Sequence, residues 1–338
     1  MCVSTGGKLR FEEAKHYPQS RSTYSRTVQE KGSTDSDGLF KMGAFRKRKV
    51  VKQGHLSSWS TMPCMWRAQV QTSAPGGTLI DDKRVAAITG AAQGIGRKTA
   101  ELLAERGFRV AIIDLRGADE TIRSIQSRGG EAFGVVGNIV EESAIDGFVQ
   151  SVYERWGRAD VLVNNAGISF ISPAEDTSAS DYRRVLEVNL VAPFLLAKAF
   201  GKRMLAAKRG CIVNVASVAG LFGVADRAAY NTSKHGLVGL TRTLAAEWGG
   251  RGVRVNAVCP SWVKTEMDVT AQASGLYTDD DIVDRIPMAR FAVPEDIALA
   301  IAFLADENQS GFINGHTLSV DGGWAADGGW DKLRREHR

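Results

Sequence analysis

The stretch Val85-Ala86-Ala87-Ile88-Thr89-Gly90-Ala91-Ala92-Gln93-Gly94-Ile95-Gly96 decides the fold of this chain. It starts with a short apolar run, which is typical of a buried strand, and ends in three spaced glycines. Glycines at such a turn let the backbone approach a pyrophosphate, which then sits at the positive end of the following helix. The stretch therefore predicts a strand, a turn and a helix that bind a dinucleotide. Because an ordinary turn can carry the same glycines, this prediction needs support from the rest of the chain.

From residue 83 onward, short apolar runs alternate with segments of helical periodicity. Continuous apolar strands that alternate with helices favour a parallel sheet covered on both faces, joined by right-handed crossovers. We therefore predict a single α/β domain with a doubly wound (Rossmann) sheet of seven parallel strands, whose ligand crevice lies at the carboxyl ends of the strands. The strands are expected at 85–89, 109–114, 132–136, 160–164, 211–215, 253–258 and 317–320, and the helices at 94–106, 121–127, 141–156, 179–207, 228–248 and 294–305.

Charge divides the 338-residue chain into two parts. Residues 1–80 contain 13 Lys and Arg against five Asp and Glu, a balance of +8; the chain totals of 43 and 38 then leave 30 against 33, or −3, for residues 81–338. The basic character thus belongs to the N-terminal segment, and it gives no reason to expect nucleic-acid binding by the remainder. No run approaches 18 apolar residues, so no membrane span is predicted.

Residues 1–80 show no sustained helical or strand period, and we interpret them as a disordered or non-native extension. Translation of the functional chain is then expected to begin at Met62 or Met65. The catalytic domain is predicted over residues 81–324, followed by a C-terminal tail at 325–338. The four cysteines lack metal-ligand spacing, which favours a reducing, cytoplasmic location.

Tyr230 and Lys234 stand four positions apart in a predicted helix, downstream of Ser217. Residues at this spacing share a helix face, with about 5–6 Å between Cβ atoms. An ammonium at that distance favours the phenolate, so we expect Lys234 to draw the tyrosine pKa from about 10 toward neutrality. Such a phenol is a general acid/base for a secondary alcohol or a ketone. By itself such a pair is more often an exposed helix pair; its order after the glycine turn and Ser217 makes catalysis the better interpretation here.

The choice between NAD and NADP depends on Asp114, which ends the second predicted strand. An acidic residue there accepts the ribose 2′-hydroxyl of NAD and repels the extra phosphate of NADP. Gln93 is uncharged where a basic residue could hold that phosphate, whereas Arg97 and Arg116 leave NADP as an alternative. We predict NAD as the cofactor, with NADP as the second choice.

These motifs, over roughly residues 83–323, resemble the classical short-chain dehydrogenases/reductases. The resemblance implies a catalytic tetrad of Asn189, Ser217, Tyr230 and Lys234, in which Asn189 holds a water of the proton relay. It also implies a homotetramer assembled through the helices at 179–207 and 228–248. Cofactor contacts are expected, besides Tyr230 and Lys234, at Gly90, Gln93, Gly94, Ile95, Gly96, Asp114, Leu115, Asn138, Ile139, Asn165, Ala166, Gly167, Pro260, Val263 and Thr265. Two positions depart from the family pattern: Asn138 replaces a common aspartate, and Ser261 follows Pro260 in place of glycine.

The substrate pocket is expected to contain Ser169, Phe222, Trp262 and Met267. Because these residues are mostly apolar and few cations accompany them, we expect a neutral secondary alcohol, such as a polyol or sugar, rather than a highly anionic substrate. A 3-oxoacyl-thioester reductase of the same family, a catalytically silent dinucleotide-binding module and a sugar-nucleotide epimerase or dehydratase are the alternatives.

Three further features of the sequence are interpreted as structural rather than catalytic. His235 points about 100° away from Lys234 around the helix, and His316 precedes the last predicted strand. Asp279–Asp281 follow Thr278 as the first-turn acids of a capped helix and not as a metal site. No metal is predicted.

Overall fold

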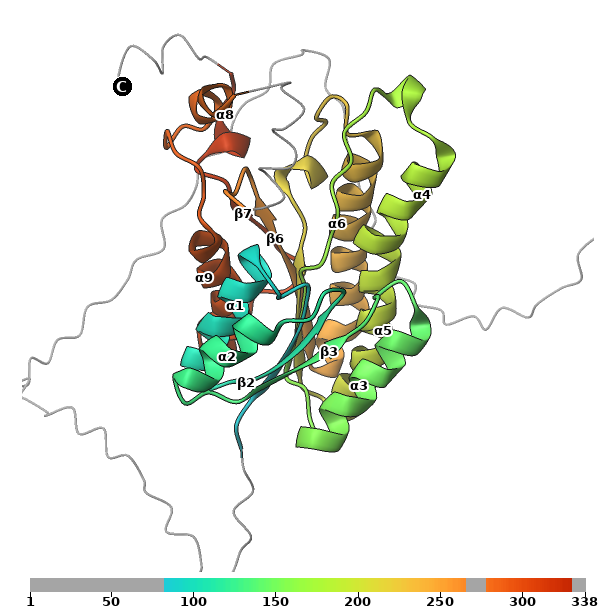
Figure 1. The fold of residues 1–338 in the computed structure, drawn as a ribbon, viewed down its shortest axis with the longest axis vertical. Helices are drawn as coiled ribbons and strands as arrows, with labels where there is room; N and C mark the ends of the chain where they lie inside the picture. The colour runs from blue at the N-terminus through green and yellow to red at the C-terminus, as the bar shows by residue number, and fades with distance from the viewer. Residues whose placement is uncertain (1–81, 266–277, 330–338) are drawn as a thin grey trace, which may run out of the picture. The chain divides into compact units, whose positions relative to one another are not determined.

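The computed structural model describes residues 82–265 and 278–329. Their core is one sheet of seven parallel strands in the order β3-β2-β1-β4-β5-β6-β7 (Figure 1). The strands are β1 (Val85–Thr89), β2 (Arg109–Asp114), β3 (Ala132–Val136), β4 (Val161–Asn164), β5 (Gly210–Val215), β6 (Val253–Pro260) and β7 (Thr317–Val320). The predicted doubly wound sheet is therefore confirmed, and the strand bounds differ from the prediction by at most two residues.

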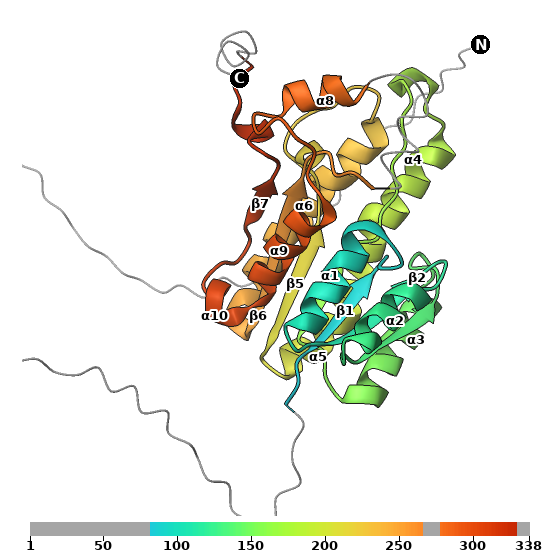
Figure 2. The same ribbon diagram turned by 60° about the vertical axis from the view of Figure 1, so that its left-hand side comes forward.

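The helices form two layers, one on each face of the sheet (Figures 1 and 2). One layer contains α1 (Gly94–Glu105), α2 (Asp119–Ser127) and α9 (Pro294–Ala305). The other contains α3 (Glu142–Trp156), α4 (Ala179–Leu186), α5 (Ala192–Ala206) and α6 (Ala228–Trp248). The shorter helices α8 (Asp279–Arg285) and α10 (Glu307–Ser310) follow β6 and α9.

Alternate side chains of each strand point to opposite faces of the sheet and contribute to the apolar core on each face. In β1, Ala86 and Ile88 face the cluster that contains α1 and α9, whereas Val85 and Ala87 face the cluster that contains α3, α5 and α6. All four side chains are fully buried. Successive side chains of a strand point to opposite faces, so a strand covered on both sides must be apolar throughout.

The crevice lies where the strand order reverses. After β3 the chain returns to the other side of β1, so that β1 pairs with both β2 and β4. In this register the carboxyl ends of β1, β4 and β5 lie at the same edge of the sheet, the position where open α/β sheets bind ligands.

The prediction of one uninterrupted helix over residues 179–207 is wrong. The structure places a π-helical turn at Glu187–Val191 between α4 and α5. Pro193 has no N–H to donate to the carbonyl of Asn189, which a regular α-helix would require, and its ring would crowd that carbonyl. The wider turn accommodates the proline, and π-turns of this kind are frequent at functional sites.

Candidate active site

The glycine turn between β1 and α1 has the backbone that a bound phosphate group requires. Gly90 and Gly94 have positive φ angles of 67° and 57°, a region that disfavours residues with a Cβ. A Cβ on Gly96 would lie 2.2 Å from the carbonyl oxygen of Gly90 and 2.5 Å from Nδ2 of Asn165. The first turn of α1 has no side-chain cap and no acidic residue, so its N–H groups and positive dipole end suit an anion. The residues present therefore fit a dinucleotide pyrophosphate.

The segment after β4 fixes this turn from the other side. Asn165 donates from Nδ2 to the carbonyls of Thr89 and Gly90 at 3.0 and 2.7 Å. The backbone N–H groups of Asn165 and Ala166 donate to Oγ1 of Thr89 at 3.1 and 3.0 Å. Two strands that are far apart in sequence are thus joined at the floor of the crevice.

The predicted selector of NAD, Asp114, is buried and lies at the edge of the turn. Its two carboxylate oxygens accept the N–H groups of Ala92 and Arg116 at 2.9 and 3.0 Å. The guanidinium of Arg116 contacts the side-chain oxygen of Gln93, whereas Arg97 pairs with Glu101 and Glu120. Since two glutamates already engage Arg97, Arg116 is the better placed of the two arginines to meet a 2′-phosphate.

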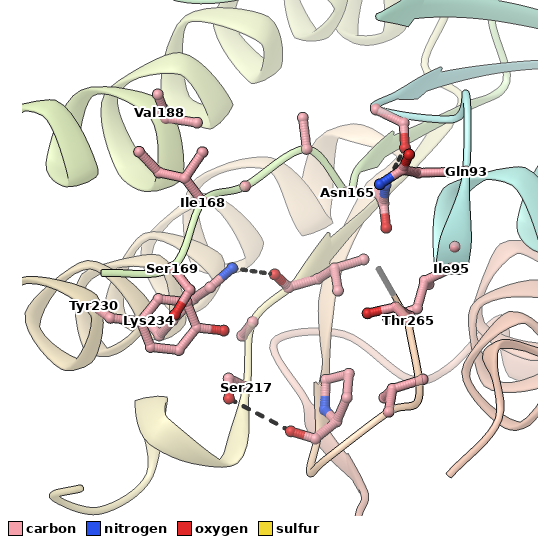
Figure 3. A pocket seen from close by; sticks show the side chains of 18 of the residues that line it. Gln93, Ile95, Asn165, Ile168, Ser169, Val188, Ser217, Tyr230, Lys234 and Thr265 are labelled. Carbon is pink, nitrogen blue, oxygen red and sulfur yellow. Dashed lines mark hydrogen bonds between the residues drawn. The ribbon is translucent and has the colours of Figure 1, made fainter. Parts of the chain in front are cut away.

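The catalytic candidates gather at the opposite end of the pocket. Figure 3 shows Ser217, Tyr230 and Lys234 together, away from Gln93, Ile95 and Asn165. Nζ of Lys234 donates to the carbonyl of Val215 at 2.8 Å and lies 5.6 Å from the centroid of the Tyr230 ring. Helix α6 presents the tyrosine and the lysine, and Ser217 caps the short 3-10 turn (Val218–Gly220) after β5 by accepting the N–H of Ala219 at 3.1 Å.

The expected drop in the pKa of Tyr230 is not found in the structure. Burial raises the pKa of this phenol above its ordinary value, and the Ser217 hydroxyl and the Arg227 charge oppose that rise without reversing it. Burial also lowers the pKa of Lys234 to about 8, because the same apolar surroundings disfavour the ammonium. The prediction considered only the charge of the neighbouring ammonium, whereas the largest effect on the pKa of each group is its desolvation.

Asn189 lies in the π-helical turn and is fully buried. Its side-chain oxygen accepts the N–H of Ile168 at 2.8 Å, and Nδ2 donates to the carbonyl of Ile168 and to Oγ of Ser233 at 2.9 and 3.1 Å. The amide therefore fixes the segment after β4 against α6. A role of Asn189 in a proton relay stays a prediction. Because its side chain makes these three hydrogen bonds, we expect the main-chain carbonyl to be the group that holds the relay water.

One cavity of about 450 Å³ connects the two ends of the site. Most of the predicted residues line it, and their roles stay predictions: Gly90, Gln93, Gly94, Ile95, Asp114, Leu115, Asn138, Ile139, Asn165, Ala166, Gly167, Ser169, Ser217, Tyr230, Lys234, Pro260, Trp262, Val263 and Thr265. Gly96 and Asn189 lie behind the lining and support it.

One predicted substrate contact is displaced, and another lies outside the described residues. Phe222 does not line the cavity, whereas Val218, Ala219 and Val224 of the same segment do. Met267 lies outside the described residues. Sequence reasoning missed Arg227, which does line the cavity. The available signal was its position three residues before Tyr230, at the start of the helix that carries the tyrosine.

The three features interpreted as structural do not line the cavity. The ring of His235 is exposed, with Nδ1 3.0 Å from the carbonyl of Asn231. Thr278 and Asp281 form a capping box at the start of α8. Across 82–265 and 278–329, no cluster of three or more His, Cys, Asp or Glu could hold a metal ion. No helix in those ranges is both long and apolar enough to cross a membrane.

Comparison with known proteins agrees with this geometry. A family model described as enoyl-(acyl carrier protein) reductase matches residues 90–325. The chain is 40% identical over 245 residues to the D-threitol dehydrogenase of Mycolicibacterium smegmatis, which covers 72% of this chain and 93% of that enzyme. It is 38% identical over 243 residues to a 3-oxoacyl-[acyl-carrier-protein] reductase of Synechocystis sp., covering 71% and 96%.

A solved structure gives the same result. A putative NAD(P)-dependent gluconate 5-dehydrogenase from Beutenbergia cavernae, with NADP bound at low occupancy, is 41% identical and superimposes with a TM-score of 0.68 over 72% of this chain and 97% of that chain. The fold and the motifs define an oxidoreductase of the Rossmann type. This chain belongs to the short-chain dehydrogenase/reductase family.

Proposed function

We propose that this chain interconverts a secondary alcohol, of polyol or sugar type, and its ketone by hydride transfer with NAD(H), using Tyr230 as the general acid/base. The observation that carries the proposal is a single cavity that joins the glycine turn to Ser217, Tyr230 and Lys234. The relatives named as polyol and gluconate dehydrogenases support the substrate class.

The residues divide the chemistry as follows. Ser217 donates a hydrogen bond to the substrate oxygen, and Tyr230 accepts the hydroxyl proton in oxidation and returns it in reduction. Lys234, whose pKa is lowered to about 8 by burial, orients the ribose of the dinucleotide and stabilises the phenolate once it forms. The bound nicotinamide supplies the hydride chemistry.

A spectrophotometric screen at about 340 nm tests this proposal with secondary alcohols and ketones and with both cofactors. Tyr230→Phe should lose about 10²–10⁴ in rate. His235→Gln changes an exposed residue of the same helix and should keep wild-type activity. Full activity of Tyr230→Phe would rule out the proposed base. Cofactor binding without turnover on any substrate would favour the silent binding module.

The preference for NAD is supported by the carboxylate of Asp114 at the edge of the glycine turn. Asp114→Asn keeps an oxygen that can accept the N–H of Ala92 but removes the charge. We expect the ratio of kcat/KM for NADP to that for NAD to rise about 10- to 100-fold, because a charged group contributes roughly 1.5–3 kcal/mol to a hydrogen bond. An unchanged ratio in Asp114→Asn would show that this carboxylate does not select the cofactor.

A 3-oxoacyl-thioester reductase is the second candidate, favoured by the relative from Synechocystis and by the description of the matching family model. A carrier-protein substrate would need a basic patch at the mouth of the pocket, for which Arg183 and Arg184 on α4 are candidates; Arg184 pairs with Asp181 at 3.1 Å. Acetoacetyl-CoA reduction in the same screen distinguishes the two candidates. We further propose a cytoplasmic homotetramer assembled through α5 and α6, which light scattering of the purified chain would measure.

A further inference from the structure

Arg227 brings a positive charge into the catalytic end of the cavity. It stands immediately before α6, three residues before Tyr230, and lines the cavity. Its Nη1 donates to Oγ of Ser169 at 3.0 Å, and its Cζ lies 5.8 Å from the centroid of the Trp262 ring. Both of these partners also line the cavity. The guanidinium therefore lies among the residues that a substrate must pass or touch.

The backbone around Arg227 is held from two directions. Asp226 adopts a left-handed φ of 58°, and its carbonyl accepts the N–H of Ser172 at 2.8 Å. A parallel bridge joins Ser172 to Arg227, and the carbonyl of Arg227 accepts the N–H of Asn231 at 2.7 Å to start α6. Because the turn and the helix start are both fixed, the position of this side chain follows from the fold.

The charge of Arg227 has no carboxylate partner in the described ranges. Other arginines there, such as Arg158, Arg285 and Arg290, pair with aspartates at 2.7–3.1 Å. A guanidinium has five N–H donors, and only one of those of Arg227 is used by Ser169. The Ser169 hydroxyl, which accepts that bond, keeps its own hydrogen to donate. The half-buried guanidinium of Arg227 and the neighbouring Ser169 hydroxyl can therefore both donate to a ligand at the cavity wall. A planar anion such as a carboxylate suits this pair of donors and the charge.

We propose that Arg227, with Ser169, binds a carboxylate of the substrate, so that the enzyme acts on a hydroxy acid and its oxo acid. This inference rests on the proposed function and narrows its substrate class. It replaces the expectation of a neutral substrate, which assumed a pocket with few cations. Arg227 stands three residues before Tyr230, and both residues line the same cavity. The carboxylate and the reacting hydroxyl are therefore separated by a few bonds in a compact molecule.

Three matched pairs of probes test the assignment: D-gluconate with D-glucitol, cis-4-hydroxycyclohexanecarboxylate with its methyl ester, and 3-hydroxybutyrate with its methyl ester. For at least one pair, the wild-type enzyme should prefer the acid by 10-fold or more in kcat/KM. Arg227→Gln should lower kcat/KM for that acid, mainly through KM, about 10- to 100-fold more than kcat/KM for its neutral partner, on which the Arg227 charge acts only through Tyr230. Arg227→Lys should recover part of the loss, because lysine restores the positive charge but not the planar set of N–H donors of a guanidinium.

The control is Arg123→Gln, which removes an exposed arginine of α2 outside the cavity and should leave both members of each pair unchanged. A purely structural role, in which Arg227 only fastens the segment that carries Ser169, predicts that Arg227→Gln lowers acid and neutral partner by the same factor. That outcome, or a wild-type preference for the neutral partner in every pair, overturns the proposal.

Binding separates failure of this inference from failure of the proposed function. Calorimetric titration of the Tyr230→Phe enzyme, saturated with NADH, should show at least one of the three acids binding at least 10-fold more tightly than the Tyr230→Phe/Arg227→Gln double variant binds it. If no probe is turned over but this difference is present, the proposed function is wrong and the carboxylate site stands. If none of the acids shows the difference, the site is refuted whatever the turnover.

Discussion

Replacing Lys234 with methionine tests whether burial destabilises the charged form of this lysine in the folded protein. Lys234 is 4% exposed, and its ammonium donates one described hydrogen bond, to the carbonyl of Val215. Burial lowers its pKa to about 8 in the folded protein, from an ordinary value of 10.5. Methionine keeps most of the side-chain volume and removes the charge. The cofactor-free protein should therefore respond to pH differently in the two forms.

Proton linkage determines whether the stability of the folded protein rises or falls with pH. Because the folded pKa is the lower one, the unfolded state binds more protons between pH 8 and 10.5, and wild-type stability should rise with pH in that window. At about 1.36 kcal/mol per pKa unit, the burial penalty at pH 7 is roughly 3 kcal/mol, and about 2 kcal/mol of it should disappear by about pH 9.5. The substitution also removes the hydrogen bond to Val215 and can leave a cavity. These two effects do not depend on pH, so they cancel when the stability difference at one pH is compared with that at the other.

The assay is urea unfolding of both forms without cofactor, at pH 7 and at about pH 9.5 and one fixed protein concentration. The difference in unfolding free energy, wild type minus Lys234→Met, should increase by about 2 kcal/mol between the two pH values. The same measurement in a Tyr230→Phe background removes any contribution from ionisation of the phenol. A difference that stays constant within about 0.5 kcal/mol would refute the claim that Lys234 is desolvated.

Two further predictions concern the glycine turn and the phenol. Gly96→Ala places a Cβ 2.2 Å from the carbonyl of Gly90, so dinucleotide affinity should fall at least 10-fold by calorimetry, whereas Gly147→Ala, where a Cβ meets nothing within 4 Å, should bind normally. Because burial raises the pKa of Tyr230 and oxidation needs the phenolate, kcat/KM for alcohol oxidation should rise with pH above neutrality, and that for ketone reduction should fall. Ser217→Ala removes a hydrogen bond that lowers this pKa, so its oxidation profile should shift to higher pH; an unshifted profile would contradict the contact.

The strands and the glycine turn could be predicted because their causes are local. A continuous apolar run buried on both faces is typical of a strand in a parallel sheet, and the runs at β1 and β2 were bounded correctly to the residue. The interruption of the long helix was also local in origin, since Pro193 lies within it. Its consequence, a π-turn that positions Asn189, depends on packing against the segment that carries Ile168.

The sequence by itself determined the sheet, the order of the motifs and the residues that meet at the carboxyl ends of the strands, because strand burial and glycine conformation act over a few residues. Only the tertiary structure decided the charge states and the shape of the pocket. Desolvation of Tyr230 and Lys234 depends on segments from β5, β6 and the loop after β4, which the sequence separates widely. The same convergence turned Arg227 from one basic residue among many into the cation that faces the substrate, since its surroundings exist only once the chain has folded.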